Sequence, residues 1–262
     1  MKFKDKKIII IGPSPNILNN NNYKKFESYD IICRIKKSFP VPKNLKNSLG
    51  ERTDILLSNL KLRKGNIYQN NFDKLKKKDM IEFDYEFYKK NNLNFQKDLE
   101  KKGKVKIYKH FLRYGKKCKC NYKFNNKIKF ILFPYPLINQ FERFYTNFQN
   151  SCSHVPFLVI YQEQEDSYNY LKKELNGYEP TIFMAGIYHL LKYEFKELYI
   201  TGITFQRDGY INSYRTDKEH DIRKNQIKNI HNMNNEINLL KKLIEQDKRI
   251  KVDEELEKIL ND

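Results

Sequence analysis

The chain has 262 residues, enough for one large α/β domain or two small ones with a full hydrophobic core. Apolar residues make up 39% of it, which excludes a disordered chain, and no uninterrupted run of about 18 apolar residues is present to form a membrane span. The net charge of +19 suggests nucleic-acid binding. However, Lys and Asn are spread along the whole chain, as in proteins of AT-rich genomes, so we expect most lysines to be solvated surface.

The basic N-terminus and the cysteines point to a soluble cytoplasmic protein, with peripheral membrane attachment as the alternative location. The first apolar run is only about four residues long, and a secretory signal needs roughly 7–15. Cys33, Cys118, Cys120 and Cys152 lack the spacing of a zinc site. We therefore expect reduced thiols and no structural metal.

Short apolar segments separated by turns predict a sheet in the first part of the chain. The expected strands are residues 6–11, 29–35, 54–58, 128–133 and 157–161. Residues 60–126 are rich in Lys and aromatic residues without clear helix caps, and we expect a lid or an acceptor-binding insertion there. An amphipathic helix is expected over residues 137–148.

The C-terminal part has the clearest pattern. Pro180 predicts a helix that begins there and runs to about residue 193, followed by a buried strand over residues 197–203 with Gly202 near its carboxyl end. Apolar residues at helical spacing predict one long helix over residues 222–246. Strands that alternate with helices indicate a single α/β domain, residues 1–262, whose mostly parallel sheet carries helices on both faces.

Two segments before residue 60 have features of ligand sites but also ordinary structural explanations. GPSPNIL follows the first strand, where an open α/β sheet binds ligands, yet it lacks the glycines of dinucleotide and phosphate loops. A plain strand-to-helix turn explains it equally well. In GERTDILLSN, Arg52 is able to bind a phosphate or carboxylate, but a structural pair with Asp54 is the more common outcome.

His231 and Glu236 stand five residues apart in the segment IKNIHNMNNE. On one continuous helix they lie about 140° apart and share no face, so Glu236 is expected to hold a separate part of the site wall. An isolated histidine on a helix is more often structural or exposed than catalytic. This segment alone therefore does not identify a catalytic base.

Taken in order, these segments resemble the sialyltransferases of glycosyltransferase family 29. GPSPNIL, YDIICRIKK and GERTDILLSN resemble the first large motif of that family, and EPTIFMAGIYHLLKYEFKELYITGITF resembles its second, smaller motif. HNMNNE matches the last short motif, His-x4-Glu, at about the expected distance after the second. The resemblance covers roughly residues 6–58 and 178–240.

The resemblance implies a divergent, soluble member of the family with a Rossmann-like, GT-A-type domain. Such an enzyme transfers sialic acid, or a related sugar, from a CMP-sugar to a glycan hydroxyl with inversion, and it needs no metal or other cofactor. His231 then becomes the general base for the acceptor hydroxyl, a role that suits an imidazole with a pKa of about 6.5, and Glu236 belongs to the same catalytic motif. The implied donor-binding residues are Gly12, Ser14, Asn16, Lys36, Thr181 and Gly202.

Several positions depart from the family pattern, so the exact donor sugar stays open. Pro13 replaces the first Asn of the family's Gly-Asn-Ser turn, and Lys36 replaces the Asn of its Arg-x-Asn strand. The family's other histidine is missing, and Tyr214 and Arg215 occupy that region. Arg215 or His220 is therefore expected to neutralise the leaving phosphate.

Two other interpretations remain open at this point. The chain is alternatively a basic nucleic-acid-binding protein, because its many Tyr and Phe side chains can stack on bases, although it contains no recognisable nucleic-acid motif. It is alternatively an inactive relative that binds a nucleotide sugar, which the changes at Pro13 and Lys36 favour and the retained His231 disfavours. The sequence does not specify the acceptor, the linkage or the oligomeric state.

Overall fold

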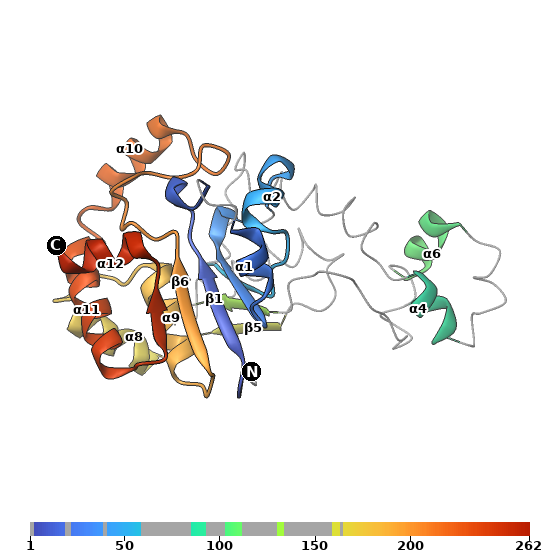
Figure 1. The fold of residues 1–262 in the computed structure, drawn as a ribbon, viewed down its shortest axis with the longest axis horizontal. Coiled ribbons are helices and arrows are strands. Elements are labelled where there is room, and N and C mark those ends of the chain that lie inside the picture. Colours follow the sequence, from blue (N-terminus) through green and yellow to red (C-terminus); the bar gives the residue numbers. More distant parts are fainter. Residues whose placement is uncertain are drawn as a thin grey trace.

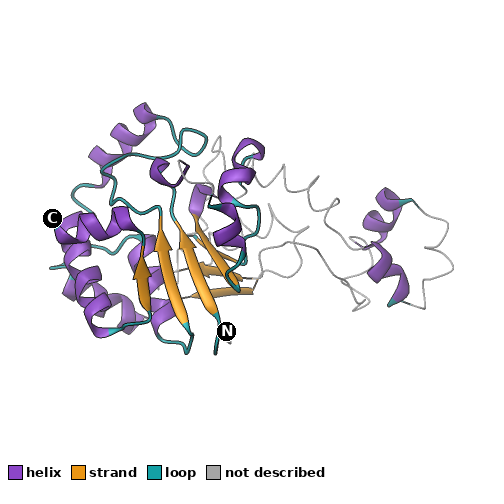
Figure 2. Cartoon of the chain, viewed as in Figure 1, coloured by secondary structure: helices purple, strands orange, loops and turns teal. Residues whose placement is uncertain are grey.

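A seven-stranded parallel sheet forms the centre of the computed structural model (Figures 1 and 2). The structure describes residues 3–18, 22–38, 41–58, 85–92, 103–111, 130–133, 159–162 and 165–262. The strands are β1 (Lys7–Ile11), β2 (Ile31–Ile35), β3 (Ile55–Leu57), β4 (Phe130–Phe133), β5 (Val159–Gln162), β6 (Glu197–Thr201) and β7 (Ile250–Val252). Every neighbouring pair runs parallel, so the predicted α/β class with a parallel sheet is confirmed.

Strand β1 shows why the sheet must be covered on both faces. Its four consecutive isoleucines are all fully buried. Ile8 and Ile10 belong to one hydrophobic cluster, whereas Ile9 and Ile11 belong to the other. Because successive side chains of a strand point to opposite faces, a continuous apolar run needs a hydrophobic layer on each side.

Helices supply these two layers, as Figure 1 shows. Buried residues of one face come from α8 (Glu165–Glu174), α9 (Ile182–Leu191), α11 (Met233–Gln246) and α12 (Glu254–Asn261). Those of the other face come from the short helices η1 (Pro15–Leu18), α1 (Tyr23–Glu27), η3 (Lys43–Leu45) and α2 (Lys46–Leu49). The prediction of helices on both faces is therefore confirmed. None of the described helices has the length and apolar character that a membrane span requires.

Two short helices, α4 (Tyr85–Lys90) and α6 (Lys104–His110), lie within residues 60–126, where the sequence predicts an insertion, and they pack against each other. The Tyr88 hydroxyl lies 3.1 Å from Nδ1 of His110, and the Tyr88 ring meets the Phe111 ring edge to face. In Figure 1 the pair lies apart from the sheet. The rest of residues 60–126 and the helix predicted over residues 137–148 lie outside the described residues. The single-domain assignment stays a prediction.

The single long helix predicted over residues 222–246 is wrong. Two helices occupy this region, α10 (Asp217–Ile227) and α11, and they are separated by a turn. Asn232 is the N-cap of α11, where its side chain accepts a hydrogen bond from the Asn235 amide at 3.1 Å. An Asn side chain competes for backbone hydrogen bonds in this way and starts a new helix. His231 consequently lies in the turn directly before α11, not on a helix.

The order of the strands reverses at the centre of the sheet. From β1 the chain adds β2, β3, β4 and β5 successively on one side, and it then crosses to place β6 and β7 on the other side. At such a reversal the connections leave neighbouring strands in opposite directions, which opens a crevice at the carboxyl ends of the strands. The reversal lies between β1 and β6, and this is where we looked for a site.

Candidate functional site

A pocket of about 140 Å³ lies at this reversal, at the carboxyl ends of β1, β2 and β6. Its walls come from the turns after these strands, from the start of α9, and from the segments before α10 and α11. The polar lining residues are Ser14, Lys36, Thr181, Thr204, Gln206, Arg215, His231 and Glu236. Aromatic and aliphatic side chains, among them Phe183, Phe205, Tyr210 and Met233, form the remainder of the lining. Such a pocket, mostly apolar with a few convergent polar groups, is typical of a small-molecule site.

The floor of the pocket is main chain from the turns after β1 and β6. The Gly12 amide donates to the Thr201 carbonyl at 2.8 Å, and the Ser14 amide donates to the Gly202 carbonyl at 3.1 Å. A Cβ atom on Gly12 would lie only 2.1 Å from the Gly202 carbonyl oxygen, so no other residue fits there. Gly202 itself has a φ of +69°, which favours glycine.

Ser14 places a buried hydroxyl at this floor. The residue is only 1% exposed, and its Oγ has no hydrogen-bond partner among the described residues. A buried hydroxyl without a partner is costly, so its retention on a pocket wall indicates that a bound ligand or solvent supplies the partner.

Thr181 and Glu236 join the first turns of α9 and α11. The Thr181 amide donates to Oε1 of Glu236 at 2.6 Å, and its hydroxyl donates to Oε2 at 2.8 Å. The same hydroxyl accepts from the Met184 amide and caps α9. Glu236 is 1% exposed, and burial raises the pKa of its carboxyl to about 7, although the two hydrogen bonds from Thr181 act in the opposite direction.

His231 is held in the pocket wall by the chain before α9. Its Nδ1 lies 2.7 Å from the Glu179 carbonyl oxygen, and the Glu179 amide donates to the Ile230 carbonyl at 2.9 Å. A carbonyl only accepts, so Nδ1 must carry the proton of this hydrogen bond. In the neutral ring the basic lone pair is then on Nε2, which is the tautomer a general base requires.

Arg215 brings a cation to the opposite part of the lining. Its guanidinium carbon lies 4.3 Å from the centre of the Tyr210 ring, so the flat group stacks on the aromatic face. Within the described part of the chain, the guanidinium makes no hydrogen bond or ion pair. A fixed guanidinium with its N–H groups available is suited to bind a phosphate or a carboxylate.

Comparison with known proteins does not assign the chain to a family. No protein-family model matches the chain, and a search among curated proteins gives no match. The site must therefore be interpreted from its own geometry. Within the described ranges, no group of three or more His, Cys, Asp or Glu side chains is arranged to hold a metal ion.

The structure brings most of the predicted site residues together, but not all of them. Ser14, Lys36, Thr181, Gly202, Arg215, His231 and Glu236 line the pocket. Gly12 lies behind the floor, where its lack of a side chain allows the turns after β1 and β6 to come into contact. Asn16 lines a second pocket beside Lys25 and Tyr199, away from the other predicted donor-binding residues. His220 is buried against Tyr210, with ring centres 5.4 Å apart, and does not line the pocket.

Sequence reasoning missed the segment after β6 that closes one wall. Phe205 and Gln206 have left-handed backbone angles, with φ of 48° and 67°, and the Phe205 ring meets the Phe183 ring edge to face. The Asp208-Gly209 dipeptide that follows is a turn signal, and it was the one local indication that the chain folds back here. Tyr210, the stacking partner of Arg215, follows directly after this turn.

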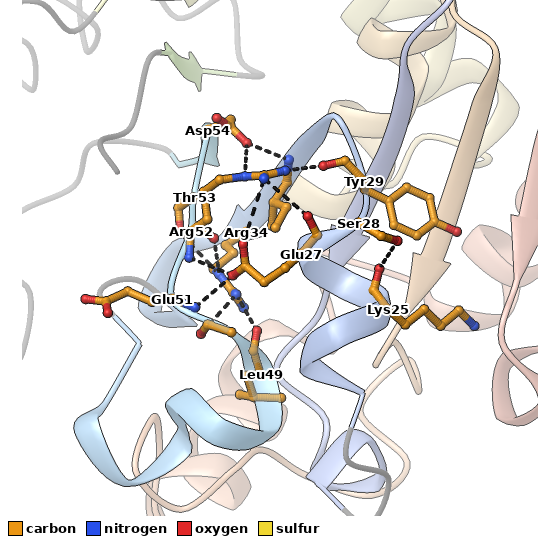
Figure 3. Close-up of polar contacts among 12 residues, drawn as sticks. Lys25, Glu27, Ser28, Tyr29, Arg34, Leu49, Glu51, Arg52, Thr53 and Asp54 are labelled. Atoms are coloured by element: carbon orange, nitrogen blue, oxygen red, sulfur yellow. Dashed lines mark hydrogen bonds and ion pairs between the residues drawn. The ribbon is translucent and has the colours of Figure 1, made fainter. Parts of the chain in front are cut away.

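A second polar cluster, shown in Figure 3, accounts for Arg52. Its guanidinium donates from Nε to Oδ2 of Asp54 at 3.0 Å and lies 3.8 Å from Oε2 of Glu27. The structural pair between Arg52 and Asp54 that the sequence favoured is therefore confirmed. Arg34, next to it, is 0% exposed and donates to the Thr53 hydroxyl at 3.1 Å and to the Leu49 carbonyl at 2.6 Å.

Proposed function

We propose that this protein is an inverting, metal-independent glycosyltransferase of the sialyltransferase type. It uses a Rossmann-like, GT-A-type domain to transfer sialic acid, or a related sugar, from a CMP-sugar to a glycan hydroxyl. One observation carries the proposal: His231, oriented through Nδ1 by the Glu179 carbonyl, lies in the same pocket as several groups suited to bind an anion.

Three of these groups support a phosphate subsite. Helix α9 directs its first turn, with the N-cap Thr181, at the pocket, and the positive end of a helix dipole favours an anion. Ser14 offers a buried hydroxyl, and Arg215 offers a permanent charge with a planar set of donors. Together they suit the phosphate that joins the nucleoside to the sugar of a CMP-sugar.

His231 is the general base that deprotonates the acceptor hydroxyl. As the acceptor oxygen bonds to the anomeric carbon, Nε2 of His231 takes the hydroxyl proton. The bond between the anomeric carbon and the phosphate oxygen breaks, and its electron pair leaves with CMP. Arg215 stabilises the negative charge that develops on this leaving phosphate. Attack opposite the leaving group inverts the anomeric centre, and no step requires a metal.

The apolar part of the lining is suited to one ring of the ligand. Phe183, Phe205, Tyr210 and Met233 offer faces and edges on which a sugar or a base can pack. A volume of about 140 Å³ is smaller than a complete sugar nucleotide, so only the phosphate and one adjacent ring fit inside. The rest of the donor and the acceptor extend toward the mouth of the pocket.

A thermal-shift panel tests the nucleotide specificity. CMP, CDP, UDP, GDP, ATP and a short oligonucleotide are compared on the wild type, on His231→Ala and on His110→Ala, a histidine outside the pocket. At 100 times its dissociation constant a ligand adds about 2.7 kcal/mol, which raises the melting temperature of a domain this size by about 5–10 °C. We expect this shift with CMP in all three proteins, because His231 acts on the acceptor.

Transfer from CMP-sialic acid to a panel of oligosaccharide acceptors then tests the base. His231→Ala should lose about 10²–10⁴ in rate, whereas Lys242→Ala, a surface substitution on α11 outside the pocket, should keep the wild-type rate. A melting-temperature shift with a nucleotide other than CMP would mean that the donor is a sugar linked to that nucleotide. A shift with CMP but no transfer would favour the interpretation of the protein as an inactive relative that binds a nucleotide sugar. A salt-sensitive shift with the oligonucleotide alone would contradict the enzyme and favour nucleic-acid binding.

A further inference from the structure

Glu236 is a buried carboxyl in the pocket wall that has no cationic partner within the described part of the chain. Its side-chain hydrogen bonds within the described residues come from the amide and the hydroxyl of Thr181, both neutral donors. Buried carboxylates are normally paired with a cation or strongly hydrogen-bonded, because burial penalises the charge. Glu236 is stabilised by hydrogen bonds but not by a cation among the described residues, so its charged and neutral forms are close in free energy.

The pKa of Glu236 reflects this balance. Burial raises it to about 7, and the two donors of Thr181 keep it from rising further. Near neutral pH the carboxyl is therefore present in both forms. A group at this balance point responds strongly to any further charge placed in the same pocket.

Among the described residues, the surrounding lining contains two permanent cations, Lys36 and Arg215, and no second carboxyl. The titratable and charged side chains that face the pocket from other elements are Lys36 after β2, Tyr210 and Arg215 before α10, and His231 before α11. Helix α9 adds the positive end of its dipole at Thr181. Among the described lining residues Glu236 is the one carboxyl, so it is the group that an incoming anion repels.

We propose that Glu236 is largely ionised in the ligand-free pocket and becomes protonated when an anionic ligand binds, so that each binding event takes up a proton from solvent. This inference rests on the proposed function, because it requires a phosphate-bearing ligand in the same pocket. Protonation also changes Glu236 from an acceptor-only group into one that can donate a hydrogen bond. By linkage, the affinity for the anion increases as the pH falls through neutrality, which couples donor binding to pH.

Calorimetry of CMP binding tests this coupling. CMP is titrated at pH 7.5 into the wild type, Glu236→Gln and His231→Ala, each in buffers that differ in ionisation enthalpy. Proton uptake makes the measured enthalpy depend on the buffer. We expect about 0.5–0.8 proton taken up per CMP by the wild type, because a carboxyl with a pKa of about 7 is about three-quarters ionised at pH 7.5. His231→Ala should retain most of this uptake, and Glu236→Gln should lose it.

Each outcome decides the inference. Uptake that disappears in Glu236→Gln, with CMP still bound, supports it. CMP binding whose enthalpy is independent of the buffer, or uptake that persists in Glu236→Gln, overturns the inference and leaves the proposed function intact. No binding of CMP to the wild type overturns both.

A second measurement needs no variant at this position. In wild-type protein labelled with ¹³C at the glutamate carboxyl carbons, one resonance should titrate near pH 7 without ligand, and CMP should move that midpoint upward. If no carboxyl titrates above about pH 6, the inference is wrong even if Glu236→Gln fails to fold.

Discussion

Two polar clusters in this protein differ in how their charges are compensated. In the cluster of Figure 3, Arg52 pairs with Asp54 and lies near Glu27, and Glu27 also accepts from the Glu51 and Arg52 amides. In the pocket wall, the partners that the described residues supply to Glu236 are neutral donors, and the partner that they supply to the Arg215 guanidinium is an aromatic ring.

This difference separates structural charges from charges that are held for a ligand. The Figure 3 cluster connects the ends of α1 and α2 to the starts of β2 and β3, and within it Arg52 is compensated by Asp54 and Glu27. Arg34 donates to the Leu49 and Arg52 carbonyls and to the Thr53 hydroxyl, whereas its Nη1 has no hydrogen-bond partner among the described residues. Burial lowers the pKa of the Arg34 guanidinium to about 10, which still leaves it charged at neutral pH. Among the described residues, Glu236 has no cationic partner and Arg215 has no anionic one, and a phosphate would supply a partner for Arg215. Four experiments test whether the two clusters differ in this way.

Arg34→Ala should have the largest effect on stability. Arg34 is fully buried, and its removal leaves a cavity and deprives the Leu49 carbonyl and the Thr53 hydroxyl of a donor. We expect the free energy of unfolding to fall by about 3–5 kcal/mol, measured by urea denaturation. Arg215→Ala is the matched control and should cost less than about 1 kcal/mol, because that guanidinium makes only a stacking contact. Equal losses for the two variants would contradict the comparison.

Glu236→Gln should change how stability depends on pH. The pKa of Glu236 is about 7 in the folded protein and 4.5 in the unfolded chain, so the folded state binds the proton more tightly. This contribution to stability is complete below pH 4.5 and is lost as the pH rises through 7. The loss amounts to about 3 kcal/mol, and the glutamine variant avoids it.

The difference in unfolding free energy between Glu236→Gln and the wild type should therefore grow between pH 5 and pH 8, in favour of the variant. Asp54→Asn provides the contrast, because it removes a carboxyl paired with Arg52 and should destabilise the protein at pH 7 and above. Parallel curves for Glu236→Gln and the wild type would rule out an unusual carboxyl at this position.

Arg215→Ala should weaken CMP binding by about 10–100-fold, since a hydrogen bond to a charged group contributes about 1.5–3 kcal/mol. The CMP affinity of Arg215→Lys should lie between those of Arg215→Ala and the wild type, because lysine keeps the charge but loses the planar set of donors. Both dissociation constants can be measured by calorimetry at low and at physiological salt. An unchanged constant for Arg215→Ala would remove this residue from the phosphate subsite.

The smallest effect is expected for Arg207 and Asp262, an ion pair outside both clusters. Its atoms lie 2.8 Å apart, but the side chains are 45% and 64% exposed. A double-mutant cycle with alanine at both positions should give a coupling of less than about 1 kcal/mol that decreases with salt. A larger coupling would mean that exposure is a poor guide to the role of charges in this protein.

Strand β7 (Ile250–Val252) was not predicted, because it has only three residues with an exposed Lys in the middle. The other six strands were predictable from the sequence, because they are largely apolar runs that only a core buried on both faces accommodates. KIIII and ELYIT are examples. The break between α10 and α11 was not predicted, since Ile227, Met233 and Ile237 keep helical spacing across the turn. The apolar pattern is compatible with both one helix and two, and only the capping role of Asn232 distinguishes them.

The site was predictable in its members but not in its contacts. One motif selected Thr181 and another selected His231 together with Glu236, and nothing local links Thr181 to Glu236, which are 55 residues apart. The carbonyl that orients His231 belongs to Glu179, a residue singled out by no motif, because any residue has a carbonyl to offer. Interactions of this kind depend on the packing of α9 against α11 and leave no trace in the pattern of side chains.

The contact between Gly12 and Gly202 has a consequence for how this protein can diversify. It joins the turns after β1 and β6 through main-chain atoms alone, so the base of the site does not depend on which side chains surround it. The walls, by contrast, come from the separate segments around Phe205, Arg215 and His231. Substitutions of single wall residues can therefore change the substrate preference. The backbone contact between the two glycines would stay the same in each such variant.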